Sequence, residues 1–119
     1  MKNVLVIDDD LYNRENIRLN LIPSENHIDC VDTAKEGLEC LSRKNYDLII
    51  SEEFLPDQSG INLLKKIQAM GKKNKFILFT NFGINRIKEE AEKLEIDKLV
   101  EKPYNESELY RSIKKMLSD

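Results

Sequence analysis

The stretch YDLIISEEFLP, residues 46–56, passes from a buried strand into an acidic loop. Leu48, Ile49 and Ile50 form the continuous apolar run that is typical of a strand covered on both faces. Glu52 and Glu53 follow, at the point where the chain is expected to reach the surface. Because a strand covered on both faces needs helices on either side, this stretch favours an α/β fold.

The same alternation of patterns runs along the whole chain. Apolar runs typical of strands alternate with segments in which apolar residues recur at helical spacing. The expected strands are 3–7, 27–31, 47–51, 75–80 and 97–101, and the expected helices are 10–22, 33–44, 60–70, 84–94 and 105–117. With right-handed crossovers, this order predicts a doubly wound sandwich, a five-stranded parallel sheet with helices on both faces.

Length and composition are those of a single globular domain, expected to cover residues 1–119. The net charge of -3 argues against a dedicated nucleic-acid-binding protein, which would usually carry a basic excess. Apolar runs are too short for a signal peptide or a membrane span, so the expected location is cytoplasmic. The two cysteines, Cys30 and Cys40, lie on apolar patterns and are expected to be small free residues in the interior.

Helix ends carry their own signals in the sequence. Thr33 precedes an apolar pattern with Glu36 three residues later, which predicts a capping box. Gly71 follows the helix expected over 60–70 and suits its C-terminal cap. The last helix is expected to begin at Asn105 or Ser107.

Polar residues follow the expected strands at their carboxyl ends, where parallel α/β folds bind ligands. Asp8, Asp9 and Asp10 follow the first strand, Glu52 ends the third, Thr80 the fourth and Lys102 the fifth. Clustered carboxylates usually hold a hard divalent cation, and Mg²⁺ matches this donor set. Thr80 and Lys102 are groups that hydrogen-bond and neutralise phosphoryl oxygens.

Four segments in this order resemble the receiver domain of two-component response regulators. They are VLVIDDD (4–10), DLIISEEFLPDQSG (47–60), FILFTN (76–81) and VEKPY (100–104). The resemblance spans the chain and implies a flavodoxin-like, CheY-like (βα)5 sandwich with strand order 2-1-3-4-5. In that family an aspartate after the third strand accepts a phosphoryl group from a histidine kinase, using Mg²⁺.

The family pattern can be carried over residue by residue. Asp8 and Asp9 match the acidic pair that binds Mg²⁺, together with the acceptor side chain and the backbone carbonyl of Phe54. Thr80 and Lys102 match the phosphoryl-contacting residues. The acceptor lies four residues before the loop proline, which is Pro56 here, and that position holds Glu52 instead of aspartate.

Further departures from the family occur at the positions that change on activation. Asn81 stands where the family usually has a small residue, and Leu99 where it often has an aromatic one. Glu95 stands where the family usually has glycine. A residue other than glycine costs about 1 kcal/mol of stability at this position if the backbone is left-handed there. Of the remaining acids near the acceptor, Glu53 is expected to face solvent, and Asp57 is a remote candidate for stray phosphorylation.

The extra methylene of Glu52 displaces its carboxylate by about 1 Å, a misplacement that can cost about 10²-fold in phosphoryl transfer. The leading hypothesis is therefore a non-enzymatic, atypical or pseudo-receiver in which Glu52 mimics phosphorylation. An inert scaffold that only retains Mg²⁺ is a second possibility. The alternatives are a conventional acceptor that is slow or carries an engineered glutamate, and a small Mg²⁺-dependent phosphatase with Asp8 as nucleophile, which the chain-wide resemblance disfavours.

Partners follow from the resemblance alone. A histidine kinase or phosphotransfer protein is expected upstream, with the departure at Glu52 putting that contact in question. Downstream, the face of the fourth helix, fifth strand and fifth helix is expected to contact an output domain or partner protein. Direct contact with nucleic acid or membrane is not expected.

Overall fold

The computed structural model describes residues 2–21, 26–81 and 84–118, and in this part of the chain strands and helices alternate as predicted. The strands are β1 (Asn3–Ile7), β2 (His27–Val31), β3 (Leu48–Glu52), β4 (Lys75–Thr80) and β5 (Lys98–Glu101). The helices are α1 (Leu11–Leu21), α2 (Ala34–Arg43), α3 (Gly60–Ala69), α4 (Ile84–Lys93) and α5 (Glu106–Ser118). Boundaries within the described residues differ from the predicted ones by at most one residue, and residue 22, the predicted end of the first helix, lies outside the described residues.

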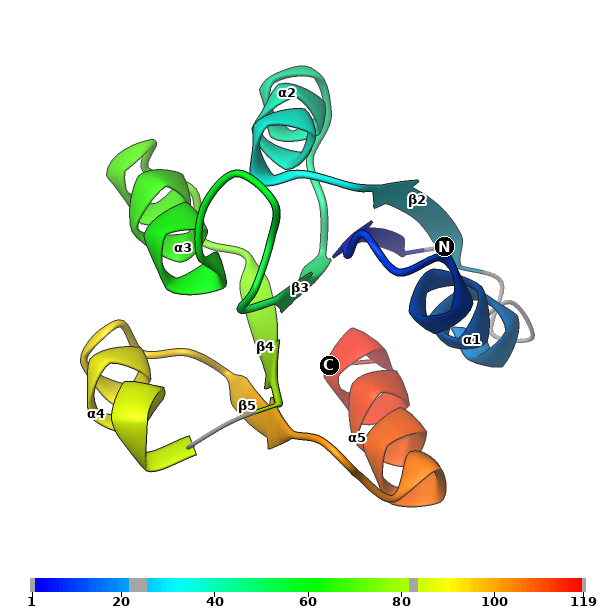
Figure 1. Cartoon of the computed structure of the whole chain (residues 1–119). Coiled ribbons are helices and arrows are strands. Elements are labelled where there is room, and N and C mark those ends of the chain that lie inside the picture. The colour runs from blue at the N-terminus through cyan, green and yellow to red at the C-terminus, as the bar shows by residue number, and fades with distance from the viewer. Residues whose placement is uncertain (1, 22–25, 82–83, 119) are drawn as a thin grey trace.

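The sheet is parallel with strand order β2-β1-β3-β4-β5, which confirms the predicted topology. Helices α1 and α5 cover one face of the sheet, and α2, α3 and α4 cover the other (Figure 1). No helix in the described ranges is long and apolar enough to span a lipid bilayer.

Alternate residues of the central strands feed two separate cores. In β1, Val4 and Val6 pack on the α1 and α5 side, while Leu5 and Ile7 pack on the side of α2, α3 and α4. All four are completely buried, as expected for a parallel strand covered on both faces. The two cores therefore hold the strand ends at fixed positions.

The predicted helix-end signals act locally. The Thr33 hydroxyl accepts a hydrogen bond from the Glu36 amide at 3.1 Å, as a capping box requires. The same hydroxyl donates to the Glu36 carboxylate, whereas in the usual capping box that carboxylate accepts from the backbone amide of the capping residue. Asn105, and not Ser107, caps α5 by accepting the Glu108 amide at 2.9 Å. Gly71 has φ 78° after α3, and Glu95 has φ 56° after α4, which places a non-glycine residue in the left-handed region. Both cysteines are free and half-buried.

Gly60 opens α3 at a point where no side chain fits. A Cβ there would lie 2.6 Å from the Glu52 carbonyl oxygen and 2.5 Å from Leu78 Cδ1. Because a backbone atom cannot yield as a side-chain end can, we expect Gly60→Ala to lower the free energy of unfolding by about 1–3 kcal/mol in urea denaturation.

Gly37→Ala is the matched control, because a Cβ at Gly37 would meet side-chain atoms and no backbone atom, with Ile7 Cδ1 at 2.6 Å and Ile7 Cγ1 at 3.2 Å. A gain in helix propensity of about 1 kcal/mol offsets that contact. Equal losses of stability in the two variants would contradict the role of the close backbone approach at Gly60.

Candidate functional site

The register of the sheet brings four predicted site residues to one edge. Ile7 pairs with Ser51 and Glu52 with Phe79, so Asp8 and Glu52 lie at the ends of adjacent strands. The ladder continues past the strands, where the Lys102 amide donates to the Thr80 carbonyl at 2.8 Å. Asp8, Glu52 and Thr80 are all buried. The topological switch between β1 and β3 therefore carries a polar cluster, as doubly wound folds predict.

The central contact of this cluster is an ion pair. Lys102 Nζ lies 2.8 Å from Glu52 Oε2, with the two side chains 20% and 11% exposed. The same ammonium group lies 5.8 Å from the centroid of the Phe79 ring, within the range of a cation–π interaction. The long arm of Glu52 thus turns across the strand ends toward β5.

Burial makes these acids harder to ionise. Desolvation raises the pKa of Glu52 to about 7, the hydrogen bond from Lys102 acts against this rise, and the charges of Asp8 and Asp9 add to it. Burial likewise raises the pKa of Asp8, while the Asp10 amide and Lys102 oppose the rise. Transfer of the charged carboxylates out of water costs more free energy here than the single ion pair contributes.

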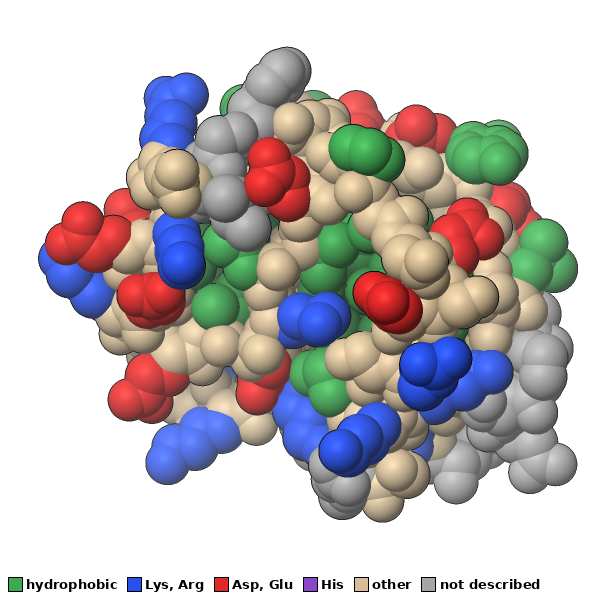
Figure 2. All heavy atoms as spheres, turned by 90° about the horizontal axis from the view of Figure 1, so that it is seen from below, with side chains coloured by type: hydrophobic (Ala, Val, Ile, Leu, Met, Phe, Trp, Pro, Cys, Tyr) green, Lys and Arg blue, Asp and Glu red, His purple; other side chains and the backbone are tan. Residues whose placement is uncertain are grey.

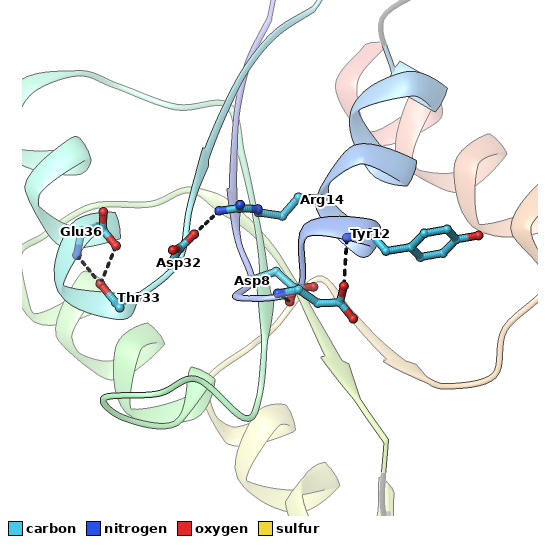
Figure 3. A network of polar contacts seen from close by, with 7 residues as sticks. Asp8, Tyr12, Arg14, Asp32, Thr33 and Glu36 are labelled. Carbon is cyan, nitrogen blue, oxygen red and sulfur yellow. Dashed lines mark hydrogen bonds and ion pairs between the residues drawn. The ribbon is translucent and has the colours of Figure 1, made fainter.

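The acids after β1 have different partners. Asp8 Oδ1 accepts the Asp10 amide at 2.9 Å, and Asp10 Oδ1 accepts the Tyr12 amide at 2.9 Å (Figure 3). Asp10 therefore caps α1 instead of joining the polar cluster. Asp9 is exposed at the rim.

The remaining predicted site residues lie around this edge at different depths. Phe54 is 56% exposed and forms an isolated antiparallel bridge with Ser59. Asn81 is exposed, directly after β4. Leu99 is partly buried and packs against the core on the α2, α3 and α4 side. Leu99 therefore fills an interior position at the place where the family often has an aromatic residue.

Two acids of the β3–α3 segment, residues 53–59, have partners that sequence analysis missed. Glu53 was expected to face solvent, but its Oε1 accepts the Ile61 amide at 3.0 Å, and the side chain is half-buried. Asp57 accepts the amides of Ala34 and Lys35 at 3.0 and 2.9 Å. An acid one residue after Pro56 is the only sequence signal for the second contact, since its partners lie 22 and 23 residues earlier.

Carboxylate oxygens suit Mg²⁺ chemically, but the observed arrangement does not present a ready cation site. Glu52 Oε2 lies on Lys102, and Asp8 Oδ1 accepts a backbone amide. Across residues 2–21, 26–81 and 84–118, no three Asp, Glu, His or Cys side chains gather closely enough to hold a metal ion. Ligation of Mg²⁺ by Asp8, Asp9, Glu52 and the Phe54 carbonyl stays a prediction.

Known proteins resemble this chain over nearly its whole length. Two-component response regulator PhoP of Pseudomonas aeruginosa is 27% identical over 114 residues, which are 96% of this chain and 51% of that protein. This chain thus spans about half the length of such relatives. A two-component response regulator from Clostridium difficile has a TM-score of 0.90 at 26% identity, covering 99% of this chain and 97% of that one.

A third relative is also known from a solved structure. Response regulator protein TrrA from Thermotoga maritima, in complex with Mg(2+)-BeF, is 31% identical, with a TM-score of 0.84 and coverage of 98% of this chain and 100% of that one. The family model for the response regulator receiver domain matches residues 4–114. Receiver domains are signalling modules and generally not enzymes. Together with the strand order and the polar edge, this match shows that the chain belongs to the response regulator receiver domain family.

Proposed function

We propose that this chain is an atypical receiver, a pseudo-receiver, that signals through protein contacts without being phosphorylated. The observation that carries the proposal is the 2.8 Å pair between Glu52 and Lys102. Glu52 occupies the family's acceptor position, and its carboxylate already makes the contact that Lys102 would otherwise make with a phosphoryl oxygen. An acceptor oxygen in contact with Lys102 is thus built into the chain, and it carries its negative charge above a pKa of about 7.

The Glu52 carboxylate imitates a phosphoryl group only partly in charge, but it makes the same contact with Lys102. A carboxylate has one negative charge and two acceptor oxygens, whereas a phosphoryl group has up to two charges and three oxygens. The longer side chain nevertheless places its oxygen on Lys102 from the end of β3. We infer that this pairing biases the domain toward a signalling arrangement that changes little with the state of a kinase.

Cation binding is expected to be weak in this arrangement. A Mg²⁺ ion that used Glu52 would have to draw its carboxylate away from Lys102, leaving Asp8 and Asp9 as the remaining acids of the predicted set. The domain is therefore expected to hold its arrangement without a bound metal ion, and loss of magnesium is expected to alter it little.

The output surface is proposed to be the face of α4, β5 and α5, as in the family resemblance. Figure 2 shows this face, with apolar side chains recessed near its centre and charged side chains of both signs around them. Three partly buried hydrophobic residues belong to this face: Ile87 of α4, Leu99 of β5, and Tyr104 in the connection between β5 and α5. Tyr104 packs edge-on against Phe79, with 5.5 Å between the ring centroids. This face therefore contacts the same Phe79 ring that lies against the Lys102 ammonium group. The partner is proposed to be an output domain or a separate protein.

Beryllofluoride, an analogue of the phosphoryl group, tests the proposal. We expect the amide spectrum of the native chain to change little when beryllofluoride and Mg²⁺ are added, because Glu52 already fills the contact with Lys102. Glu52→Asp is expected to respond with shifts around Thr80, Lys102 and Leu99.

Glu53→Asp is the matched control for this experiment. It removes the same methylene from a neighbouring glutamate whose carboxylate is turned to the Ile61 amide. The control is expected to behave like the native chain. A large response of the native chain to beryllofluoride would favour the conventional phospho-acceptor instead.

A further inference from the structure

Every backbone amide in the first turn of α2 donates a hydrogen bond. For two of these four amides the acceptor is a side chain from another part of the chain. The amides of Glu36 and Gly37 donate to the Thr33 hydroxyl and the Thr33 carbonyl, both at 3.1 Å. The preceding amides, of Ala34 and Lys35, donate to the two carboxylate oxygens of Asp57. The amides at the start of a helix have no intrahelical partner, and here the first intrahelical bond is that of the Gly37 amide to Thr33, so Asp57 satisfies two of the three helical amides before it.

Asp57 lies in the segment that begins directly after Glu52. The two ends of this segment are joined by the Phe54–Ser59 bridge and by the Gly60 amide, which donates to the Glu53 carbonyl at 2.9 Å. Its middle reaches across to α2 through Asp57. The acidic side chain at a helix N-terminus is stabilised by the helix dipole as well as by the two hydrogen bonds.

The ionisation of Asp57 agrees with this contact. Slight burial raises the pKa of Asp57, but hydrogen bonds from the Lys35 and Ala34 amides outweigh it, so the pKa falls below its usual value. The carboxylate is thus in its charged, doubly accepting form at neutral pH.

The start of α2 is in turn tied to α1. Arg14 of α1 forms an ion pair with Asp32, the residue before Thr33 (Figure 3). A continuous set of contacts therefore runs from α1 through the start of α2 to Asp57 and on to the residues next to Glu52.

We propose that Asp57 is a positioning residue of the site: it fixes the β3–α3 segment to the N-terminus of α2 and so sets where the side chain at position 52 is presented. Motion of α2 then reaches the site through this carboxylate. An ordinary helix cap would stabilise α2 alone and leave the polar edge unaffected.

Amide exchange measured by NMR tests the contact itself. Asp57→Ala is expected to speed exchange at Ala34 and Lys35 and to shift the amides of residues 53–59. Thr33→Ala removes a different cap of the same helix and is the matched control, with faster exchange at Glu36 and no shifts in the segment. Asp57→Asn keeps an acceptor oxygen and is expected to restore part of the protection.

A second readout rests on the proposed function and uses the Glu52→Asp background. There, labelling by acetyl phosphate with Mg²⁺ is expected to slow by about tenfold or more with Asp57→Ala, because a small misplacement of the acceptor is costly. Thr33→Ala is expected to leave the labelling rate unchanged. If the background labels and Asp57→Ala labels equally fast, or if both variants slow labelling alike, the positioning role is wrong. If the background is not labelled at all, residues other than Glu52 also prevent transfer, and the amide shifts still decide the role of Asp57.

Discussion

The Glu52→Asp variant is expected to gain the mass of one phosphoryl group when incubated with acetyl phosphate and Mg²⁺, while the native chain gains none over the same time. The rate difference is expected to be about 10²-fold or more, because the extra methylene misplaces the attacking oxygen by about 1 Å. Intact-protein mass spectrometry measures the result directly.

The physical reason lies in what the carboxylate already contacts. In phosphoryl transfer the acceptor oxygen forms a bond to phosphorus as the bond to the acetate oxygen breaks, and catalysis is mainly alignment and charge neutralisation. In the native chain, Glu52 Oε2 lies 2.8 Å from the ammonium group that would neutralise the incoming phosphoryl group. Shortening the side chain is expected to withdraw the oxygen from Lys102 and so to free its ammonium group for the donor.

Glu53→Asp again supplies the control, and it is expected to remain unlabelled. If the native chain is labelled as fast as Glu52→Asp, the added methylene does not disable the acceptor, and the chain is a conventional receiver. If neither is labelled, the surrounding pocket, with Asn81 at its rim, also prevents transfer.

Acidification is expected to stabilise the folded protein between pH 8 and pH 5, in contrast to most proteins with salt-bridged acids. The pKa of Glu52 is about 7 in the folded chain against 4.5 for an ordinary glutamate. Between these values the folded state holds a proton that the unfolded state has lost, so stability falls as pH rises through this window and levels off above about 7. The full difference corresponds to about 3 kcal/mol.

Urea denaturation at several pH values checks the expected slope, and Glu52→Gln is the comparison. Burial also raises the pKa of Asp8 and of Glu53, so part of the slope is expected to persist in Glu52→Gln. The pKa values of Asp29 and Asp57 are lowered from 3.8, so these two acids change the stability only below about pH 4, outside this window. Identical pH profiles for the native chain and Glu52→Gln would show that Glu52 ionises normally in the folded state.

The architecture was predictable because its determinants are local in sequence. Continuous apolar runs such as Leu48–Ile50 and the helical periodicity between them follow from burial on one or both faces, and these patterns can be seen without the fold. The cap at Gly71 was likewise expected from its place after a helical pattern, whereas the family resemblance only raised the question of left-handed backbone at Glu95. The gathering of Asp8, Glu52, Thr80 and Lys102 at one edge followed from the rule that parallel strands end together.

The partners of the acids were not predictable in the same way. Glu53 was expected to face solvent but accepts a hydrogen bond from the Ile61 amide. Asp57 was considered only as a remote candidate for phosphorylation, but it accepts a hydrogen bond from the Ala34 amide. The Glu53 contact depends on how the β3–α3 segment turns into α3, and the Asp57 contact depends on how the segment packs against the start of α2, 22 to 23 residues earlier. Asp10, grouped by sequence with Asp8 and Asp9, caps α1 because the chain turns into a helix directly after it.

The sequence by itself determined the parallel sheet and the family, and it led to the proposal of a glutamate at the acceptor position, since these depend on residue type, spacing and periodicity. Only the tertiary structure decided that Glu52 lies on Lys102 and that Asp57 holds the start of α2. These pairs are separated by 50 and 22–23 residues, so they form only after the crossovers have placed β5 beside β4 and α2 beside the β3–α3 segment. The direction that a carboxylate takes then depends on which donor the packed strands and helices bring within reach.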